Sequence, residues 1–297
     1  IFNYKHLGED IGSREARRAS RDLRNLIKDT LDNPTPDSPV YTFIPALQKP
    51  SLSDQEFNDL LDDAEEIQES FSAHLSNAEA AAKDSNHIDA AREFQTALEF
   101  NPDHDYLTQQ YALHTYKSEH PSKLLALSDA SAIIARLSPE TSNDPETLGI
   151  AGAIYKNMWK ATQDLGALDR AITFYERGFE LRRDYYNGEN AALCIEARSQ
   201  LQDDKDEAQF DRMTASKIRS SVSSMLLDVI DSPDFDQRSD QKWIFATLAN
   251  CLFAAGKIQQ ADEFEEKFLE RSTAQWEHET FESNKTALLE FHNNNIS

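Results

Sequence analysis

Apolar residues along most of the chain recur at intervals of three or four positions, which is the spacing of an amphipathic helix. The pattern begins after Ser53, a residue type that favours the N-cap of a helix. The apolar positions of this first helix are Phe57, Leu60, Leu61, Ala64, Ile67, Phe71 and Leu75. Acidic residues fill most of the positions between them, as expected of a solvated face. We predict helical structure from Ser51 to the end of the chain.

Small residues add a repeat to this helical pattern. Over residues 71–102, small or aromatic residues stand at the packing positions of two successive helices, and a proline closes the unit: Ala78, Ala81, Ala90, Phe94, Ala97 and Pro102. This is the spacing of a tetratricopeptide repeat (TPR). One helical hairpin cannot bury its apolar face alone, so several must stack. The predicted fold is therefore all-α, a TPR-like α-solenoid of stacked helical hairpins.

Further hairpins follow with less regular patterns. We place one at 105–139, a second from about 145 to at least 178, two helices over 189–230 and a later unit that contains residues 245–268, and we expect a final helix over 275–292. In the unit that begins near 145, the distance between the two helical patterns indicates an insertion of about one or two turns near residues 160–168.

Residues 1–50 follow a different pattern. Short apolar runs of strand length, at 1–6 and 40–47, flank a basic helix pattern over 13–31. Strand–helix–strand is a fragment of an α/β sheet and cannot bury both of its faces alone. We expect 1–50 to be the C-terminal fragment of an upstream α/β domain, cut from a longer protein, and 51–297 to be the helical repeat domain. The arginines of the basic helix fit a solvated surface better than a partner-binding face.

Charge limits the partners. The chain has 53 acidic and 30 basic residues, a formal net charge of −23. DNA, RNA and anionic membranes bind basic surfaces, so we predict no nucleic-acid and no membrane partner. A local basic pocket is still compatible with this charge, because screening confines each field to about 8 Å. No run approaches the ~20 apolar residues that cross a bilayer.

Residues that carry out chemistry do not form a recognisable motif. Cys194 and Cys251 are the two cysteines, too few for a disulfide framework, so a reducing, cytoplasmic location is the simpler interpretation. Cys194 lies in an apolar run and fits a buried position. Phosphate-loop, nucleophile-elbow and HExxH motifs are absent, and no histidine has the i, i+4 partner of a helical metal site. We predict no catalytic residue, metal or cofactor, and therefore no enzyme.

The segment 152–194 is more specific than the rest. It contains a box of Gly152, Ile154, Tyr155, Lys156 and Asn157, followed by Tyr175, Gly178, Phe179 and Glu180, and then by Tyr186, Gly188, Asn190 and Ala192. These motifs resemble the TRAFs-binding region in the central regulatory part of the apoptosis signal-regulating kinases, and related bacterial TPR proteins. Trp243 and Trp276 also stand where that family tends to place aromatics, at the starts of its last helices. One departure is Ala153, where the family commonly has an arginine.

The resemblance implies regulation. In the kinases this region positions neighbouring domains and recruits signalling proteins, and in the bacterial relatives it is proposed to sense nucleotide-derived signals. A polar, partly basic set of residues in this segment is the candidate site for a ligand or partner: Lys156, Asn157, Arg182, Arg183, Tyr185, Tyr186 and Asn190. The alternative is structural, with Tyr155 and Tyr186 as wedges between helices, Asn190 as a cap and Lys156 in solvent.

Three functions remain open from the sequence. The first is a regulatory scaffold in a signalling protein that binds a protein partner or a neighbouring domain. The second is a sensor for a nucleotide-derived small molecule, with residues 152–190 as the wall of its pocket. The third is an accessory part of an enzyme whose catalytic domain lies upstream. We place the scaffold ahead of the sensor, and both ahead of the accessory part.

Overall fold

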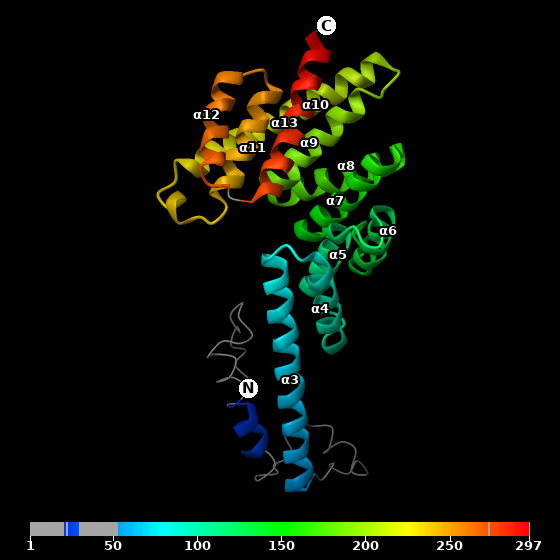
Figure 1. The fold of residues 1–297 in the computed structure, drawn as a ribbon, viewed down its shortest axis with the longest axis vertical. Coiled ribbons are helices and arrows are strands. Elements are labelled where there is room, and N and C mark those ends of the chain that lie inside the picture. Colours follow the sequence, from blue (N-terminus) through cyan, green and yellow to red (C-terminus); the bar gives the residue numbers. More distant parts are fainter. Residues whose placement is uncertain (1–20, 22, 30–52, 273, 297) are drawn as a thin grey trace, which may run out of the picture.

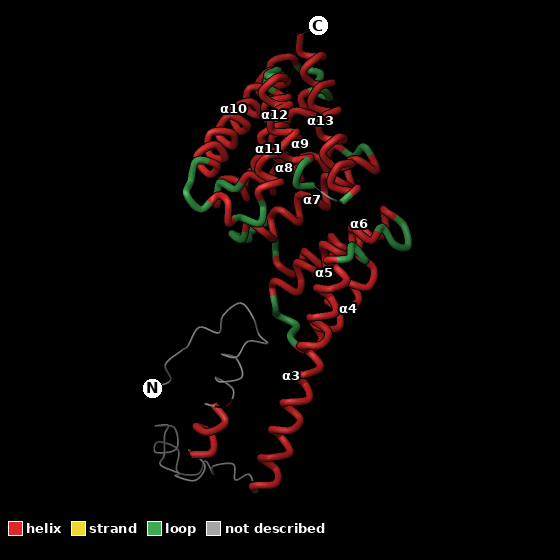
Figure 2. The backbone as a smooth tube through the Cα atoms, turned by 60° about the vertical axis from the view of Figure 1, so that its left-hand side comes forward, coloured by secondary structure: helices red, strands yellow, loops and turns green. Residues whose placement is uncertain are grey.

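The computed structural model describes residues 21, 23–29, 53–272 and 274–296, and the described part of the chain contains helices and loops but no strand (Figures 1 and 2). A short helical segment covers residues 23–29. The longer helices that follow are α3 (Asp54–Lys83), α4 (His87–Phe100), α5 (Asp105–Ser118), α6 (Lys123–Ile134), α7 (Pro145–Thr162), α8 (Leu165–Arg182), α9 (Tyr185–Ser199), α10 (Lys205–Ile230), α11 (Gln241–Ala254), α12 (Ile258–Leu269) and α13 (Gln275–Ile296). The prediction of an all-α repeat fold is confirmed.

Helix α3 begins where the sequence predicts. The Ser53 hydroxyl accepts from the Glu56 backbone N–H, and the Glu56 carboxylate accepts from the Ser53 N–H, which together form a capping box. The first half of α3 is less buried than its apolar spacing indicates: Leu60 is 54% exposed and Ile67 is 55% exposed. Among the α3 residues whose burial is described, Phe71 is the first that is buried. Only the second half of α3 therefore belongs to the stack of repeats.

Consecutive helices pack against each other as hairpins from α3 to α10 (Figure 1). Four of these helices begin after an aspartate whose carboxylate accepts a backbone N–H of the first turn, at positions 20 residues apart: Asp144, Asp164, Asp184 and Asp204. The predicted insertion near 160–168 is not a loop. Instead α7 and α8 each have 18 residues, so the extra length lies within the helices.

Two glycines allow neighbouring helices to approach closely, one within a hairpin and one between two hairpins. A Cβ atom at Gly152 of α7 would lie 2.8 Å from the Tyr175 ring of α8. A Cβ at Gly178 of α8 would lie 2.7 Å from Cγ of Asn187 on α9. Both contacts are shorter than carbon atoms tolerate, so these positions require glycine for packing.

The C-terminal helices close the stack. α11 and α12 form a hairpin, and α13 packs against α11 and also contacts α9 (Figure 1). At the start of α13, the ring of Trp276 lies 5.7 Å from that of Trp243 on α11 and 5.9 Å from Nζ of Lys117 on α5. The first turn of α13 therefore lies beside α5, although seven helices separate the two along the chain.

Some predictions lie outside the described residues. The strands at 1–6 and 40–47, and with them the α/β remnant, are among these. Residues 23–29 of the predicted basic helix are helical, and Arg24 forms an ion pair with Glu65 of α3. In the described part of the chain, no helix combines the length and apolarity that a membrane span requires.

Candidate functional site

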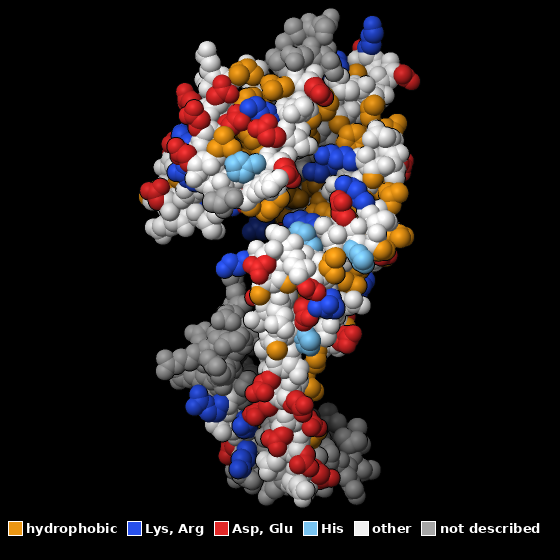
Figure 3. Space-filling model, viewed as in Figure 1, with side chains coloured by type: hydrophobic (Ala, Val, Ile, Leu, Met, Phe, Trp, Pro, Cys, Tyr) orange, Lys and Arg blue, Asp and Glu red, His pale blue; other side chains and the backbone are white. Residues whose placement is uncertain are grey.

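A hollow lies between the middle repeats and the C-terminal helices, and Lys and Arg side chains gather around it (Figure 3). The first helices of three successive hairpins, α5, α7 and α9, contribute to this part of the molecule. Lys117, Lys156 and Lys160 project from α5 and α7. We call these three side chains, together with Asn190 and Tyr186 of α9, the inner lysine surface.

Lys156 and Asn190 meet across the interface of α7 and α9. Nζ of Lys156 donates to Oδ1 of Asn190 at 2.6 Å, and Nδ2 of Asn190 donates to the backbone carbonyl of Tyr186 at 2.8 Å. Asn190 is 8% exposed and lies within α9, so it does not act as a helix cap. Its side chain is fixed at both ends and holds the Lys156 ammonium at the surface.

Two further lysines belong to this surface. Lys160 stands one helical turn after Lys156, and its pKa is lowered by burial and by the Lys156 charge. The pKa of Lys117 is lowered by burial alone. Within the described residues, none of the three ammonium groups of the inner lysine surface lies within 4.0 Å of a carboxylate. Lys117 and Lys160 are exposed and Lys156 is half-buried, and the charge of the nearby Glu189 acts on Lys160 without forming an ion pair with it.

Sequence reasoning missed Lys117 and Lys160. Lys160 could have been found, because its i, i+4 spacing from Lys156 places both on one face of a helix. Lys117 lies 39 positions before Lys156, in a repeat with a weak pattern.

Aromatic rings accompany the lysines. Nζ of Lys156 lies 5.8 Å from the centre of the Tyr175 ring, and the Tyr186 ring packs edge-on against Tyr175 at 6.1 Å. Desolvation raises the pKa of Tyr186 to about 12, so the phenol stays neutral. Tyr186 is nevertheless 47% exposed and Trp276 is 46% exposed. Trp276 therefore presents an accessible aromatic surface beside the Lys117 ammonium, and Tyr186 presents one beside Tyr175.

The other predicted site residues are placed elsewhere. Nδ2 of Asn157 donates to the Ala153 carbonyl of its own helix. The hydroxyl of Tyr185 donates to Asp240 at 3.0 Å, and the side chain packs against the C-terminal core. Arg183 is the left-handed C-cap of α8, and its guanidinium lies 5.2 Å from the Phe179 ring centre. Arg182 is exposed, and its charge partly offsets the rise that burial causes in the pKa of Glu146.

Ala153, the departure from the kinase motif, is 3% exposed and packs in the core formed by α7, α8 and α9. Its side chain does not face the inner lysine surface. A long basic side chain would have no room at this position of the core.

Buried charges lie behind the surface. Glu189 is 5% exposed, and its Oε1 has no hydrogen-bond partner. Burial raises its pKa, whereas the nearby charges of Arg219 and Lys156 lower it. Arg219 of α10 pairs with Glu196 of α9, but its Nε and Nη2 atoms also lack partners. This polar cluster connects α9, which bears Asn190, to α10.

Other kinds of chemistry receive no support from the described residues. Both cysteines are buried, as predicted for Cys194, and burial raises the thiol pKa of Cys194 to about 11 and of Cys251 to about 12. Neither is therefore a thiolate at neutral pH. No group of three or more His, Cys, Asp or Glu residues in this part of the chain could hold a metal ion.

Comparison with known families identifies one segment. A family model described as Tetratricopeptide Repeats-Sensor (TPR-S) matches residues 86–195. The match begins at the N-cap of α4 and ends within α9, so it contains the whole inner lysine surface. This segment is a TPR-type region. No curated protein and no solved structure matches the chain.

Proposed function

We propose that the chain is a non-catalytic sensor module, and that the inner lysine surface binds a small anionic, nucleotide-derived ligand. The observation that supports this most directly is the set of three lysines without carboxylate partners, in a chain where acidic residues outnumber basic ones by 53 to 30. In so acidic a chain a carboxylate could readily have stood beside each of them. An anion from outside would form the direct ion pair that these ammonium groups lack.

The aromatic surfaces refine the expected ligand. Tyr186 and Trp276 are nearly half exposed. The Trp276 ring lies beside the Lys117 ammonium, whereas the Tyr186 ring packs against Tyr175, the ring that contacts Lys156. A planar base can stack on such rings, a contact worth about 1–3 kcal/mol per base. Ammonium groups and aromatic rings side by side match a ligand that joins phosphate to a base. The TPR-S match over the same residues agrees with a sensor role.

The experiment is a binding screen on the purified chain. The probes are AMP, ADP, cyclic dinucleotides, ADP-ribose and inorganic pyrophosphate, measured by thermal shift and then by titration calorimetry. A ligand at 100 times its dissociation constant stabilises by about 2.7 kcal/mol. For a domain of this size we expect a rise in Tm of about 5–10 °C.

A matched pair of variants locates the site. Lys156→Gln/Lys160→Gln should abolish binding and keep the fold. The control, Lys83→Gln/Lys257→Gln, removes the same charge from two exposed lysines outside the inner lysine surface and should bind normally. Equal affinity of both double variants, or no binding of any probe, would contradict the sensor function.

A second candidate is a scaffold for a protein partner or a neighbouring domain. It is favoured by the first half of α3, where Leu60 and Ile67 are more than half exposed on an otherwise acidic helix. Apolar positions that stay in solvent at helical spacing are typical of a face that another helix covers. Replacing both with Ser would weaken such a partner and leave the binding of small anions unchanged.

A further inference from the structure

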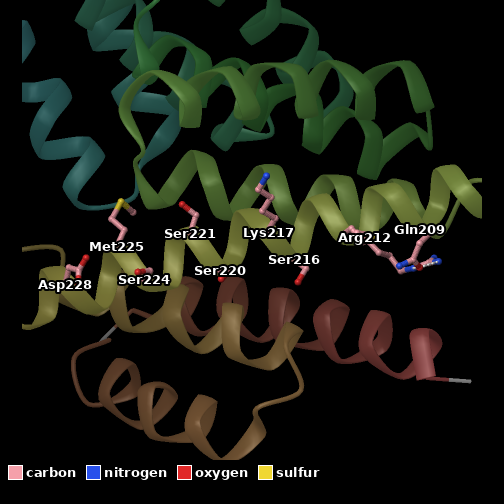
Figure 4. A pocket seen from close by; sticks show the side chains of 10 residues that line it. Gln209, Arg212, Ser216, Lys217, Ser220, Ser221, Ser224, Met225 and Asp228 are labelled. Atoms are coloured by element: carbon pink, nitrogen blue, oxygen red, sulfur yellow. Dashed lines mark hydrogen bonds between the residues drawn. The ribbon is translucent and has the colours of Figure 1, made fainter.

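Helix α10 is packed on one side and open on another. Arg219 is 5% exposed and lies on the side that packs against α9, where its Nη1 atom donates to the Glu196 carboxylate. The open side lines a groove of about 1020 Å³, with Ser216, Ser220 and Ser224 along it (Figure 4). A change in the way Arg219 holds α10 would therefore reach the surface of the molecule.

The Arg219 guanidinium uses only part of its donor capacity. Its Nε and Nη2 atoms are buried and have no hydrogen-bond partner among the described residues. These two atoms stand on the same edge of the guanidinium and form a fork that can hold a carboxylate by two parallel hydrogen bonds. Buried donors without acceptors are costly, so an acceptor that reaches this fork would be strongly favoured.

Glu189 of α9 has the acceptor that this fork lacks. It stands seven positions before Glu196, which is two turns earlier on the same face of the helix, and it is 5% exposed. Its Oε1 atom is buried and has no partner, and the charge of Arg219 acts on it. The thiols of Cys194 and Cys251, whose pKa values respond to the Glu189 charge, stay protonated. A free carboxylate oxygen and a free guanidinium fork thus lie in one buried cluster without being joined.

Cations of two helices act on Glu189. Burial raises the pKa of Glu189, and the charge of Glu196 adds to the rise. The charges of Arg219, Lys156 and Lys160 oppose it. Arg219 belongs to α10, whereas the two lysines belong to α7 and to the inner lysine surface. An anion on the lysines would therefore cancel the attraction from α7 and leave the attraction from α10.

We propose that Glu189 transmits the occupancy of the inner lysine surface to α10, an inference that rests on the proposed function. While the lysines are unoccupied, their charges hold the Glu189 carboxylate away from the Arg219 fork. A bound anion neutralises the lysines and repels Glu189, and the carboxylate then enters the fork. Glu196 keeps its bond to Nη1, so α9 holds α10 more firmly. The ligand shifts this equilibrium because its charge favours one of the two positions of Glu189.

Hydrogen exchange of the α10 backbone amides in the full chain measures how firmly this helix is held. Inorganic pyrophosphate is the probe, and calorimetry establishes its binding. We expect exchange in α10 to slow by about fivefold or more on binding, the low end of couplings between two sites. Glu189→Gln should still bind pyrophosphate but lose the slowing, because the amide carries no charge. The control Glu263→Gln removes the same charge from an exposed position of α12 and should behave as the unaltered protein.

A second measurement needs no ligand. Lys156→Gln/Lys160→Gln removes the attraction from α7, so exchange in α10 should slow without any probe, and adding Glu189→Gln should abolish the slowing. Unchanged exchange in the lysine variant would overturn the proposal, as would slowing that persists with Glu189→Gln.

The two measurements separate this proposal from the proposed function. If pyrophosphate binds and exchange in α10 does not change, the transmission by Glu189 is wrong and the sensor function stands. If no probe of the binding screen binds and the lysine variant slows exchange as expected, the sensor function is wrong and the coupling of the lysines to α10 stands.

Discussion

The cationic side chains of the inner lysine surface lack carboxylate partners, whereas those between the C-terminal helices have them. Among α9 to α13, basic groups that bridge two helices are held by carboxylates: Arg219 by Glu196, Lys242 by Glu277, and Lys285 by Glu265. On α5 and α7, Lys117, Lys156 and Lys160 have no carboxylate within 4.0 Å in the described structure. The first arrangement links helices to each other, whereas the second leaves charge available.

The difference has an energetic meaning. Burying two charges removes them from water, and their attraction to each other offsets that loss. Removing one member of the pair therefore leaves a buried charge without compensation. A lysine at a surface costs little when it is removed. The two regions should therefore respond to mutation in opposite ways: the C-terminal pairs should matter for stability, and the inner lysines for binding.

The largest effect is expected at the buried pair. Arg219→Met leaves the Glu196 carboxylate buried without its partner and should lower the free energy of unfolding by about 3–5 kcal/mol. Arg219→Met/Glu196→Gln should recover part of that loss, because no unpaired charge remains. Urea denaturation followed by circular dichroism measures both. A loss below about 1 kcal/mol for the single variant would mean that solvent reaches Glu196.

A smaller effect on stability is expected from pH, through the pair formed by His87 and His114. The Nδ1 atoms of His87 and His114 lie 3.0 Å apart, and His114 is 5% exposed and stacked on Phe94. Burial, and then the charges of His87 and Lys117, lower the pKa of His114 to about 4. The unfolded chain takes up this proton near pH 6.5 and the folded chain only near pH 4. Stability should therefore fall as the pH drops through that window.

The loss attributable to His114 is at most about 3 kcal/mol. His114→Phe keeps the stacked ring and removes the titration, so its unfolding free energy should depend less on pH between 6.5 and 4. Urea denaturation at four pH values in this range, for both proteins, gives the comparison. Parallel pH curves would show that His114 does not titrate differently in the two states.

The smallest effect on stability is expected at the lysines. Lys156→Gln/Lys160→Gln should change the free energy of unfolding by no more than about 0.5 kcal/mol. Removing two neighbouring like charges could even stabilise α7 slightly. Differential scanning calorimetry is sensitive enough. A loss of several kcal/mol would place these lysines with the structural pairs, and the contrast between the two regions would disappear.

The sequence predicted the fold well because helical spacing and small residues carry local information. Glycine at 178 and alanine at 78 mark close helix packing directly, and the structure confirms both. The extra length predicted near 160–168 lies in α7 and α8, which have 18 residues each. Leu60 and Ile67 in the first half of α3 have the apolar spacing of a core helix and yet are exposed. Spacing alone does not indicate whether another helix covers such a face.

The candidate site was only partly predictable. Lys156 and Asn190 lie 34 positions apart in one recognisable segment, and the structure brings them into contact. Asn157 and Tyr185 share that segment, but helix rotation turns them to other partners. Trp276 was singled out as an aromatic at a helix start, and nothing local indicates that it meets Lys117. Such contacts depend on curvature summed over several repeats.

The long helix α3 also sets a distance and a direction. Seventeen residues separate its start from Phe71, and at 1.5 Å per residue they place Ser53 about 25 Å from the first repeat. Each added or deleted residue would turn that end by about 100° around the helix axis. The length of the exposed half of α3 therefore sets the distance between Ser53 and the repeats, and the number of residues in it sets the direction in which Ser53 points around the helix axis.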